Sequence, residues 1–115
     1  MAEECIFCRI VAGEVSSDIV YQDEDFLAFR DISPQAPTHV LIIPKTHITS
    51  LAELTAGQQG LVGRLIILAK NLAGKEGVAE RGYRLVINCG SEGGQVVPHL
   101  HLHLIGGRRL DDRLG

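Results

Sequence analysis

Tryptophan is absent from this chain of 115 residues, and aromatic residues as a whole make up only 4% of it. No apolar run reaches the length of a transmembrane helix, so we expect no membrane partner. The first residues also lack the basic segment and apolar core of a signal peptide. We therefore expect a cytoplasmic protein.

Basic residues form no block anywhere in the sequence. Lys and Arg number 11 against 14 Asp and Glu, for a formal net charge of −3. Nucleic-acid-binding domains typically carry a basic patch, so nucleic acid is not an expected partner. A nucleotide-sized ligand stays open, because its site needs only a few local donors. Hydrophobic residues reach 45%, and repeats, linkers and low-complexity segments are missing, which predicts a single domain over residues 1–115.

Cysteine is scarce as well, and its count of three is odd. Cys5 and Cys8 form a C-x-x-C pair, whereas Cys89 stands alone in an apolar run and is interpreted as a small core residue. A reducing compartment disfavours a structural disulfide, so the pair indicates metal binding or redox chemistry. Two cysteines supply half of a zinc site, and histidines elsewhere would have to complete it.

Histidine, in contrast, is concentrated in one stretch of this sequence, His-Leu-His-Leu-His-Leu-Ile at positions 99–105. Alternation is the period of a β-strand and places the imidazoles on one face and the leucines on the other. Neighbouring histidine Cα atoms on such a strand are about 6.6 Å apart. Ser, Thr, Lys or Glu would serve equally well on the exposed face of a structural strand. Three histidines on that face therefore indicate a nucleophilic or metal-binding role.

The central histidine of this stretch, His101, is the predicted nucleophile, since imidazole can attack or exchange a proton near neutral pH. A phosphorus centre suits it, because the phosphoramidate product is labile enough to turn over. The segment Gly93-Gly94-Gln95 would offer backbone N–H groups to an anionic oxygen. Asp31 either grips a ribose hydroxyl or caps a turn, and the sequence leaves both interpretations open.

A competing interpretation is a catalytic metal held by all three histidines. His-x-His on a strand can donate two ligands to one metal. The third imidazole would lie about 13 Å along the strand from the first and would reach the same ion poorly. A site built from all three is therefore disfavoured, although one of them can still bind a metal elsewhere.

Local patterns predict an α+β fold, with an antiparallel sheet covered on one side. A long helix should follow a capping box of Thr55 and Gln58 and run to Ala73, with Gly74 as the residue after its end. Its apolar stripe is widened by Ile66 and Ile67, so it is either deeply buried or has a second contact such as a dimer interface. The other predicted elements are a short helix at 5–12 and strands at 19–22, 26–31, 39–43, 83–89 and 99–105.

The histidine stretch has the form that gives the histidine triad family its name, and the chain resembles the nucleotide-binding branch of that family. The similar segments cover nearly the whole chain: Cys5–Gly13, Phe29–His39, Ile42–His47, Gly93–Gln95 and Gly106–Arg108. The resemblance implies an antiparallel sheet with one long and one short helix. It also implies a homodimer in which two sheets join and the long helices pack at the interface.

The resemblance further implies a purine nucleotide of the AMP or GMP type beside the triad, and no organic cofactor. His101 would attack the α-phosphorus of a nucleoside phosphoramidate or a related nucleotide conjugate. Water would then release the nucleoside monophosphate from a nucleotidyl-histidine. The implied catalytic residues are His101, His103, His39 and His99. The implied nucleotide contacts are Asp31 at the ribose, Ile32 near the base, and Asn88, Gly94, Gln95, Val96, His101 and His103.

The family pattern also implies a structural zinc ion held by Cys5, Cys8, His47 and His99. Such an ion would fix the N-terminal helix to the sheet, and His99 could not then act as a base. Without a metal, the two cysteines would be ordinary half-buried residues of that helix.

Two positions depart from the branch that the chain resembles. Val96 stands where well-known members have a serine that helps to protonate the leaving group. The chain also ends without the aromatic residue that often reaches the partner's site. We therefore expect slower departure of poor leaving groups such as amines. A nucleotide-binding regulatory dimer with weak or vestigial catalysis remains the alternative function.

Overall fold

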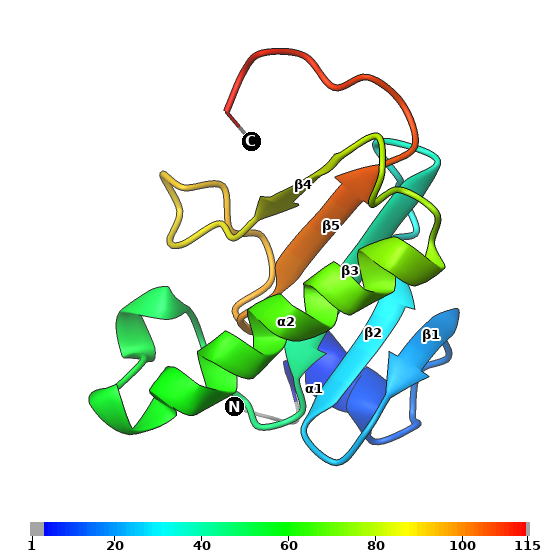
Figure 1. The fold of residues 1–115 in the computed structure, drawn as a ribbon. Helices are drawn as coiled ribbons and strands as arrows, with labels where there is room; N and C mark the ends of the chain where they lie inside the picture. The colour runs from blue at the N-terminus through cyan, green and yellow to red at the C-terminus, as the bar shows by residue number, and fades with distance from the viewer. Residues whose placement is uncertain (1–3, 115) are drawn as a thin grey trace.

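A five-stranded antiparallel sheet forms the centre of the protein, in the order β1-β2-β3-β5-β4 (Figure 1). The computed structural model describes residues 4–114, so residues 1–3 and 115 of the predicted domain lie outside the described part. The strands are β1 (Ile19–Gln22), β2 (Phe26–Arg30), β3 (Thr38–Pro44), β4 (Tyr83–Val86) and β5 (Leu102–Gly106). The predicted α+β class with an antiparallel sheet is confirmed.

Helices pack against both faces of this sheet. Helix α2 (Gln59–Lys75) crosses one face and buries Leu65, Ala69 and Leu72 against the strands (Figure 1). Helix α1 (Ile6–Val11) packs on the other face with Phe7 and Ile10. The expectation of a sheet covered on one side was therefore wrong, because the apolar residues of α1 bury part of the second face.

The long helix ends later than its sequence predicted. The capping box is confirmed, with the Thr55 N–H donating to Gln58 Oε1 at 2.9 Å, but residues Ala56–Gln58 form a 3₁₀ turn before α2 begins. Gly74 lies inside the helix, and Gly77 takes the left-handed conformation at φ +76°. The N–H groups of Gly77 and Val78 donate to the carbonyls of Gly74 and Ala73, which is a Schellman motif.

The histidine strand begins at Leu102 and not at His99. Its alternation holds, since Leu102 and Leu104 join the core under α2. The preceding residues bend away from the sheet ladder: Pro98 has no N–H to donate, and the Leu100 N–H donates to Ile48 O at 2.6 Å. The predicted strand at 83–89 is also shorter and ends at Val86.

The register of β3 against β5 brings two of the candidate catalytic histidines together. His39 pairs with Ile105 and Leu41 with His103, so His39 and His103 are diagonal neighbours on one face. Strand β3 is buried along its whole length and holds this arrangement at the centre of the sheet. Within residues 4–114, no helix has the length and apolar character needed to cross a membrane.

Candidate active site

The geometry of His101 determines which of its ring nitrogens is free to react. Its Nδ1 lies 2.7 Å from the carbonyl oxygen of His99, so Nδ1 carries the hydrogen and donates it. In a neutral imidazole the other nitrogen then has a lone pair. The residue is only 7% exposed, which limits competing contacts with water. Nε2 of His101 is thus the ring nitrogen that carries the lone pair.

A chain of hydrogen bonds determines the tautomers of the other two catalytic candidates. The backbone N–H of Gln35 donates to Nδ1 of His39 at 3.0 Å, so His39 carries its hydrogen on Nε2. That Nε2 lies 2.9 Å from Nδ1 of His103 and donates to it. His103 therefore keeps its own hydrogen on Nε2 and is a donor, with its ring centroid 5.0 Å from that of His101.

Both of these rings are neutral near pH 7. Burial lowers the pKa of His39, and the charge of Asp31 opposes that shift only in part. Burial, followed by the charges of His101 and His39, lowers the pKa of His103 to about 4. Neutral rings agree with the hydrogen-bond chain, in which each ring accepts a hydrogen bond on Nδ1.

Asp31 follows β2 and serves the turn that comes after it. Its Oδ1 accepts the Ser33 N–H at 2.8 Å, so the turn-capping interpretation is confirmed. Its Oδ2 lies 3.4 Å from Nε2 of His39 and stabilises that N–H. The side chain remains 20% exposed at the pocket, so capping and ligand contact do not exclude each other.

These residues line one open cavity of about 980 Å³. Most of the predicted nucleotide contacts lie on its wall: Asp31, Ile32, Asn88, Gly94, Val96, His101 and His103. The side chain of Gln95 instead makes structural hydrogen bonds. Its Oε1 accepts the Gly90 N–H within its own loop, and its Nε2 donates to Thr49 O at 2.7 Å. His99 is fully buried, and both of its ring nitrogens have partners within the protein.

Sequence reasoning missed the apolar wall of the cavity, which comprises Phe7, Ile10, Val15, Phe29 and Leu41. Phe7 packs edge-on against Phe29 and against His101, with ring centroids 5.4 and 5.2 Å apart. The i, i+3 spacing of Phe7 and Ile10 predicts a shared helix face. It does not predict that this face borders a ligand pocket, because most buried helix faces do not.

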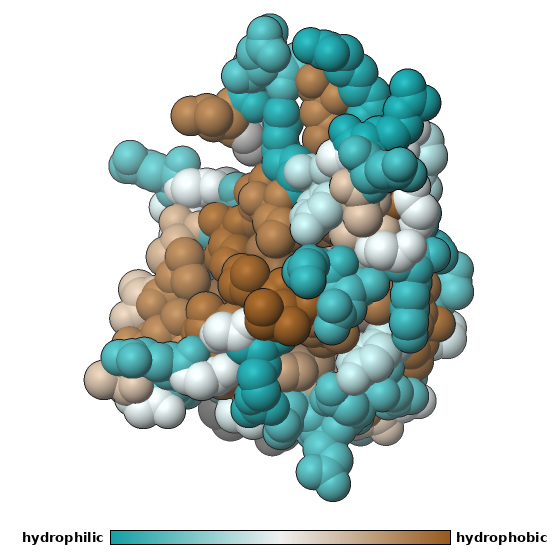
Figure 2. Space-filling model, viewed as in Figure 1, coloured by the Kyte–Doolittle hydropathy of each residue, from teal (hydrophilic) through white to brown (hydrophobic). Residues whose placement is uncertain are grey.

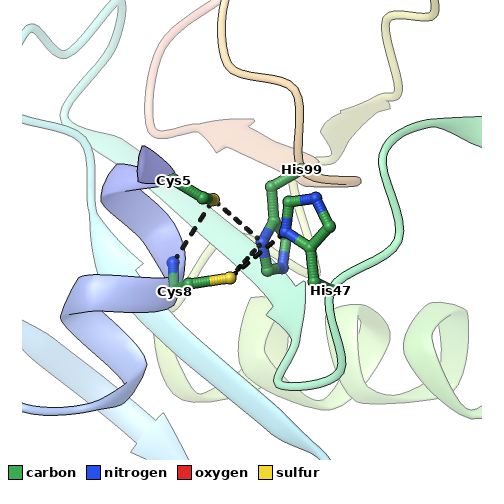
Figure 3. A group of neighbouring side chains, drawn as sticks. All are labelled: Cys5, Cys8, His47 and His99. Atoms are coloured by element: carbon green, nitrogen blue, oxygen red, sulfur yellow. Dashed lines mark hydrogen bonds between the residues drawn. The ribbon is translucent and has the colours of Figure 1, made fainter. Parts of the chain in front are cut away.

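The four predicted metal ligands converge between α1 and the residues that precede β5 (Figure 3). Nδ1 of His99 lies 3.3 Å from Cys5 Sγ and 3.6 Å from Cys8 Sγ, and Nδ1 of His47 lies 3.1 Å from Cys8 Sγ. A tetrahedral zinc ion, with bonds of about 2.3 Å to sulfur and about 2.0 Å to nitrogen, separates such atoms by about 3.5 Å. Cys5, Cys8, His47 and His99 can therefore bind a metal with little movement.

The surroundings of this group also fit a metal. Nε2 of His99 donates to Pro44 O at 2.9 Å, which leaves the Nδ1 lone pair directed at the sulfurs. Burial, followed by a hydrogen bond from Cys5 and its charge, raises the pKa of the Cys8 thiol to about 11. A thiolate at Cys8 is thus unfavourable unless a cation stabilises it.

A second group of close ligand atoms, formed by Asp31, His39 and His103, fits a metal poorly. His39 already accepts the Gln35 N–H on Nδ1 and carries its hydrogen on Nε2. A metal on that Nε2 would require an imidazolate or the loss of the Gln35 bond. His99 lies in the first group of possible ligands and His103 in the second. This separation agrees with the argument against one metal held by all three triad histidines.

Comparisons with known proteins agree with this geometry. A HIT domain model matches residues 12–110. The chain is 53% identical over 114 residues to the purine nucleoside phosphoramidase of Escherichia coli (strain K12), which covers 99% of this chain and 96% of that protein. A crystal structure of a HIT family hydrolase from Legionella pneumophila Philadelphia 1 has a TM-score of 0.95 and 50% identity, covering 97% of this chain and 100% of that chain.

A zinc-bound histidine triad family protein from Mycobacterium smegmatis is also similar, with a TM-score of 0.80 and 32% identity. This similarity covers 100% of this chain and 82% of that chain. The domain match, the identity to curated relatives and the shared fold lead to one conclusion. The chain belongs to the HIT (histidine triad) family and resembles the hydrolases of that family.

Proposed function

We propose that this protein hydrolyses purine nucleoside 5′-phosphoramidates or related nucleotide conjugates and releases the nucleoside monophosphate. The observation that carries this proposal is the set of tautomers in the active site. His101 presents a lone pair on Nε2, and the neighbouring His103 presents a hydrogen on its own Nε2. A nucleophile beside a neutral donor is the arrangement that attack on a phosphate requires.

The reaction then has two steps. Nε2 of His101 attacks the α-phosphorus and the P–N bond to the amine breaks, which leaves a nucleotidyl-histidine. Val96 has no proton to give, so the amine takes its proton from solvent. In the second step water attacks the same phosphorus and loses a proton to solvent. The P–Nε2 bond breaks, and its electron pair returns to His101.

The cavity wall supports one placement of the nucleotide. The phosphate would lie against His101 and His103, with Asn88 and Gly94 on the opposite side. The ribose would contact the Oδ2 atom of Asp31, and the base would lie between Ile32 and Phe29 of the apolar wall. His39 would act through His103, because its Nε2 donates to that ring.

We also propose that the metal of the Cys5, Cys8, His47 and His99 group is zinc. Two sulfur and two nitrogen ligands at tetrahedral separations favour it. With four protein ligands, zinc here would serve as a structural cross-link without an open position. In this proposal His99 takes no direct part in catalysis, and its carbonyl orients His101.

A homodimer is the proposed assembly. Strand β4 lies at an edge of the sheet, and its Leu85 is half-buried beside the core. On α2, Arg64 turns toward the residues just before β2, where it binds Asp25, so Ile66 faces the opposite side and is 39% exposed. Apolar side chains gather over α2 and β4 on this face (Figure 2). Ile66→Asp should therefore shift the protein toward monomer in sedimentation velocity, whereas Glu80→Gln on the surface should not.

The test of the proposed activity compares native protein with His101→Ala on adenosine 5′-phosphoramidate. The native protein should release AMP, and the variant should lose turnover while still binding AMP. The exposed Val96, which cannot protonate an amine, favours the alternative of a regulatory nucleotide-binding dimer. That alternative would be supported if native protein bound AMP but did not turn over either the phosphoramidate or an aminoacyl adenylate.

A further inference from the structure

We propose that Cys5 and Cys8 form a redox-sensitive pair. A peroxide oxidises them to a disulfide, which releases the metal and weakens nucleotide binding through Phe7. This inference rests on the metal site proposed above, and it assigns the pair a role beyond holding the metal.

The two sulfurs are placed for a disulfide. Cys5 is the N-cap of α1 and Cys8 lies in its first turn, with the Cys8 N–H donating to Cys5 Sγ at 3.4 Å. Their sulfur atoms lie within 4.8 Å of each other (Figure 3). Residues three apart on a helix have Cβ atoms about 5 to 6 Å apart, about 1 to 2 Å more than in a disulfide, but Cys5 is the N-cap and its backbone is extended rather than helical. Rotation of the side chains and a small backbone adjustment would close the bond.

Differences in exposure set the order of the reaction. Cys8 is half-buried, whereas Cys5 is only 4% exposed, so a peroxide meets Cys8 first. The sulfur of Cys8, which is a thiolate while it holds the metal, attacks one peroxide oxygen and the O–O bond breaks, which gives a sulfenic acid and hydroxide. The Cys5 thiolate then attacks the Cys8 sulfur and the S–O bond breaks, which gives the disulfide and a second hydroxide. The two sulfurs lose two electrons to the peroxide, and two solvent protons complete two waters.

Closure of this disulfide removes half of the metal's ligands. A disulfide sulfur has no negative charge to offer, and His47 and His99 alone hold zinc weakly. The metal therefore leaves when the pair oxidises. Reduction restores both thiols and lets the metal return.

Phe7 lies between Cys5 and Cys8 in the chain and connects the pair to the nucleotide pocket. Its ring packs edge-on against His99 and His101, with centroids 5.8 and 5.2 Å apart, and it lines the cavity. A new covalent link across residues 5–8 therefore moves an aromatic ring that contacts the nucleophile. His99 adds a second connection, since loss of the metal removes one of the two partners of its ring, and its carbonyl holds His101.

The experiment begins with reduced native protein. Elemental analysis gives its metal content, phosphoramidate turnover gives its activity, and calorimetry gives its affinity for AMP. Hydrogen peroxide is then titrated while a colorimetric chelator reports released metal and peptide mass mapping reports disulfides. We expect a Cys5–Cys8 disulfide that forms in step with metal release, and an affinity for AMP that falls by about tenfold. A thiol reductant with added zinc should reverse both changes.

Two variants sharpen this test. Cys8→Asp keeps an oxygen ligand for the metal but cannot form a disulfide, so it should retain metal at peroxide doses that empty the native protein. Cys89→Ser should respond as the native protein does. If Cys8→Asp does not fold, as circular dichroism would reveal, the peptide map of the native protein decides alone.

Three results would overturn the inference: metal that stays bound while the thiols are consumed, a disulfide that involves Cys89, or an unchanged affinity for AMP once the Cys5–Cys8 disulfide has formed. Reduced protein without metal would overturn the metal proposal and this inference together. Failure of the proposed hydrolysis would be recognised separately, from the turnover of the reduced, metal-loaded protein.

Discussion

Nε2 of His39 lies 2.9 Å from Nδ1 of His103, and this contact connects β3 to the triad across the sheet. Because Gln35 already donates to the other nitrogen of His39, the hydrogen between the two rings belongs to His39. His103 is thereby held as a donor toward the pocket. Two backbone groups, the Gln35 N–H and the His99 carbonyl, thus determine how the catalytic candidates are protonated.

The lowered pKa of His103 predicts that the protein loses stability in mild acid. Burial and the nearby His101 and His39 lower this pKa from 6.5 to about 4, with Asp31 opposing the shift. Between these values the unfolded chain binds more protons than the folded one, so the free energy of unfolding falls as the pH drops from 6.5 toward 4. The contribution of His103 is at most about 3 kcal/mol. Urea unfolding of native protein and His103→Gln measures it, and equal pH dependence in the two proteins would mean that His103 does not cause the loss of stability.

Asp31→Asn should weaken ribose binding without disturbing the turn, because the amide oxygen can still accept the Ser33 N–H. Loss of a charged hydrogen bond to a hydroxyl should raise KM by about tenfold. The same substitution should have a much smaller effect on the 2′-deoxy substrate, which lacks one of the hydroxyls. A full effect on both substrates would place Asp31 elsewhere in the site.

Removal of the metal should destabilise the fold, since it breaks the link between α1 and the residues before β5. A loss of about 2 to 4 kcal/mol would lower the Tm by roughly 10 to 20 °C in a domain of this size. Thermal unfolding with and without a chelator measures the change, and elemental analysis identifies the ion. An unchanged Tm in metal-free protein would argue against a structural role.

Val96→Ser should raise the turnover of the phosphoramidate, because a hydroxyl at the exposed position 96 could protonate the leaving amine. We expect an increase of at least about tenfold in kcat. Val96→Ala is the matched control, since it removes apolar bulk without adding a donor. Equal rates in the two variants would mean that proton supply does not limit departure of the amine.

The sequence predicted the class of the fold and the buried faces of its elements. Apolar residues that recur every 2 residues mark the buried face of a strand, and those that recur every 3.6 residues mark the buried face of a helix. It placed the start of the histidine strand wrongly at His99. Pro98 signals a break, but the bond from the Leu100 N–H to Ile48 O involves residues that are distant in sequence, so no local pattern contains it. Gly74 was likewise predicted to follow the end of α2, whereas the helix continues to Lys75 and Gly77 takes the left-handed conformation.

The features of the candidate site were also predictable only in part. The resemblance brought Cys5, Cys8, His47 and His99 together correctly, although they come from three separate segments. The tautomer of each histidine was beyond prediction, because it depends on backbone groups whose positions only the folded chain defines. The apolar wall around Phe7 was missed for a related reason: burial patterns do not distinguish a core from a pocket.

A rapid-quench reaction of native protein with an aminoacyl adenylate, whose carboxylate leaves without needing a proton, tests whether His101 is the nucleophile; the quenched protein is analysed by mass spectrometry of its peptides. The proposed mechanism predicts an adenylyl group on His101 that appears before AMP accumulates in solution and is absent from His101→Ala. AMP release without any adduct, or an adduct on another residue that persists in His101→Ala, would contradict it.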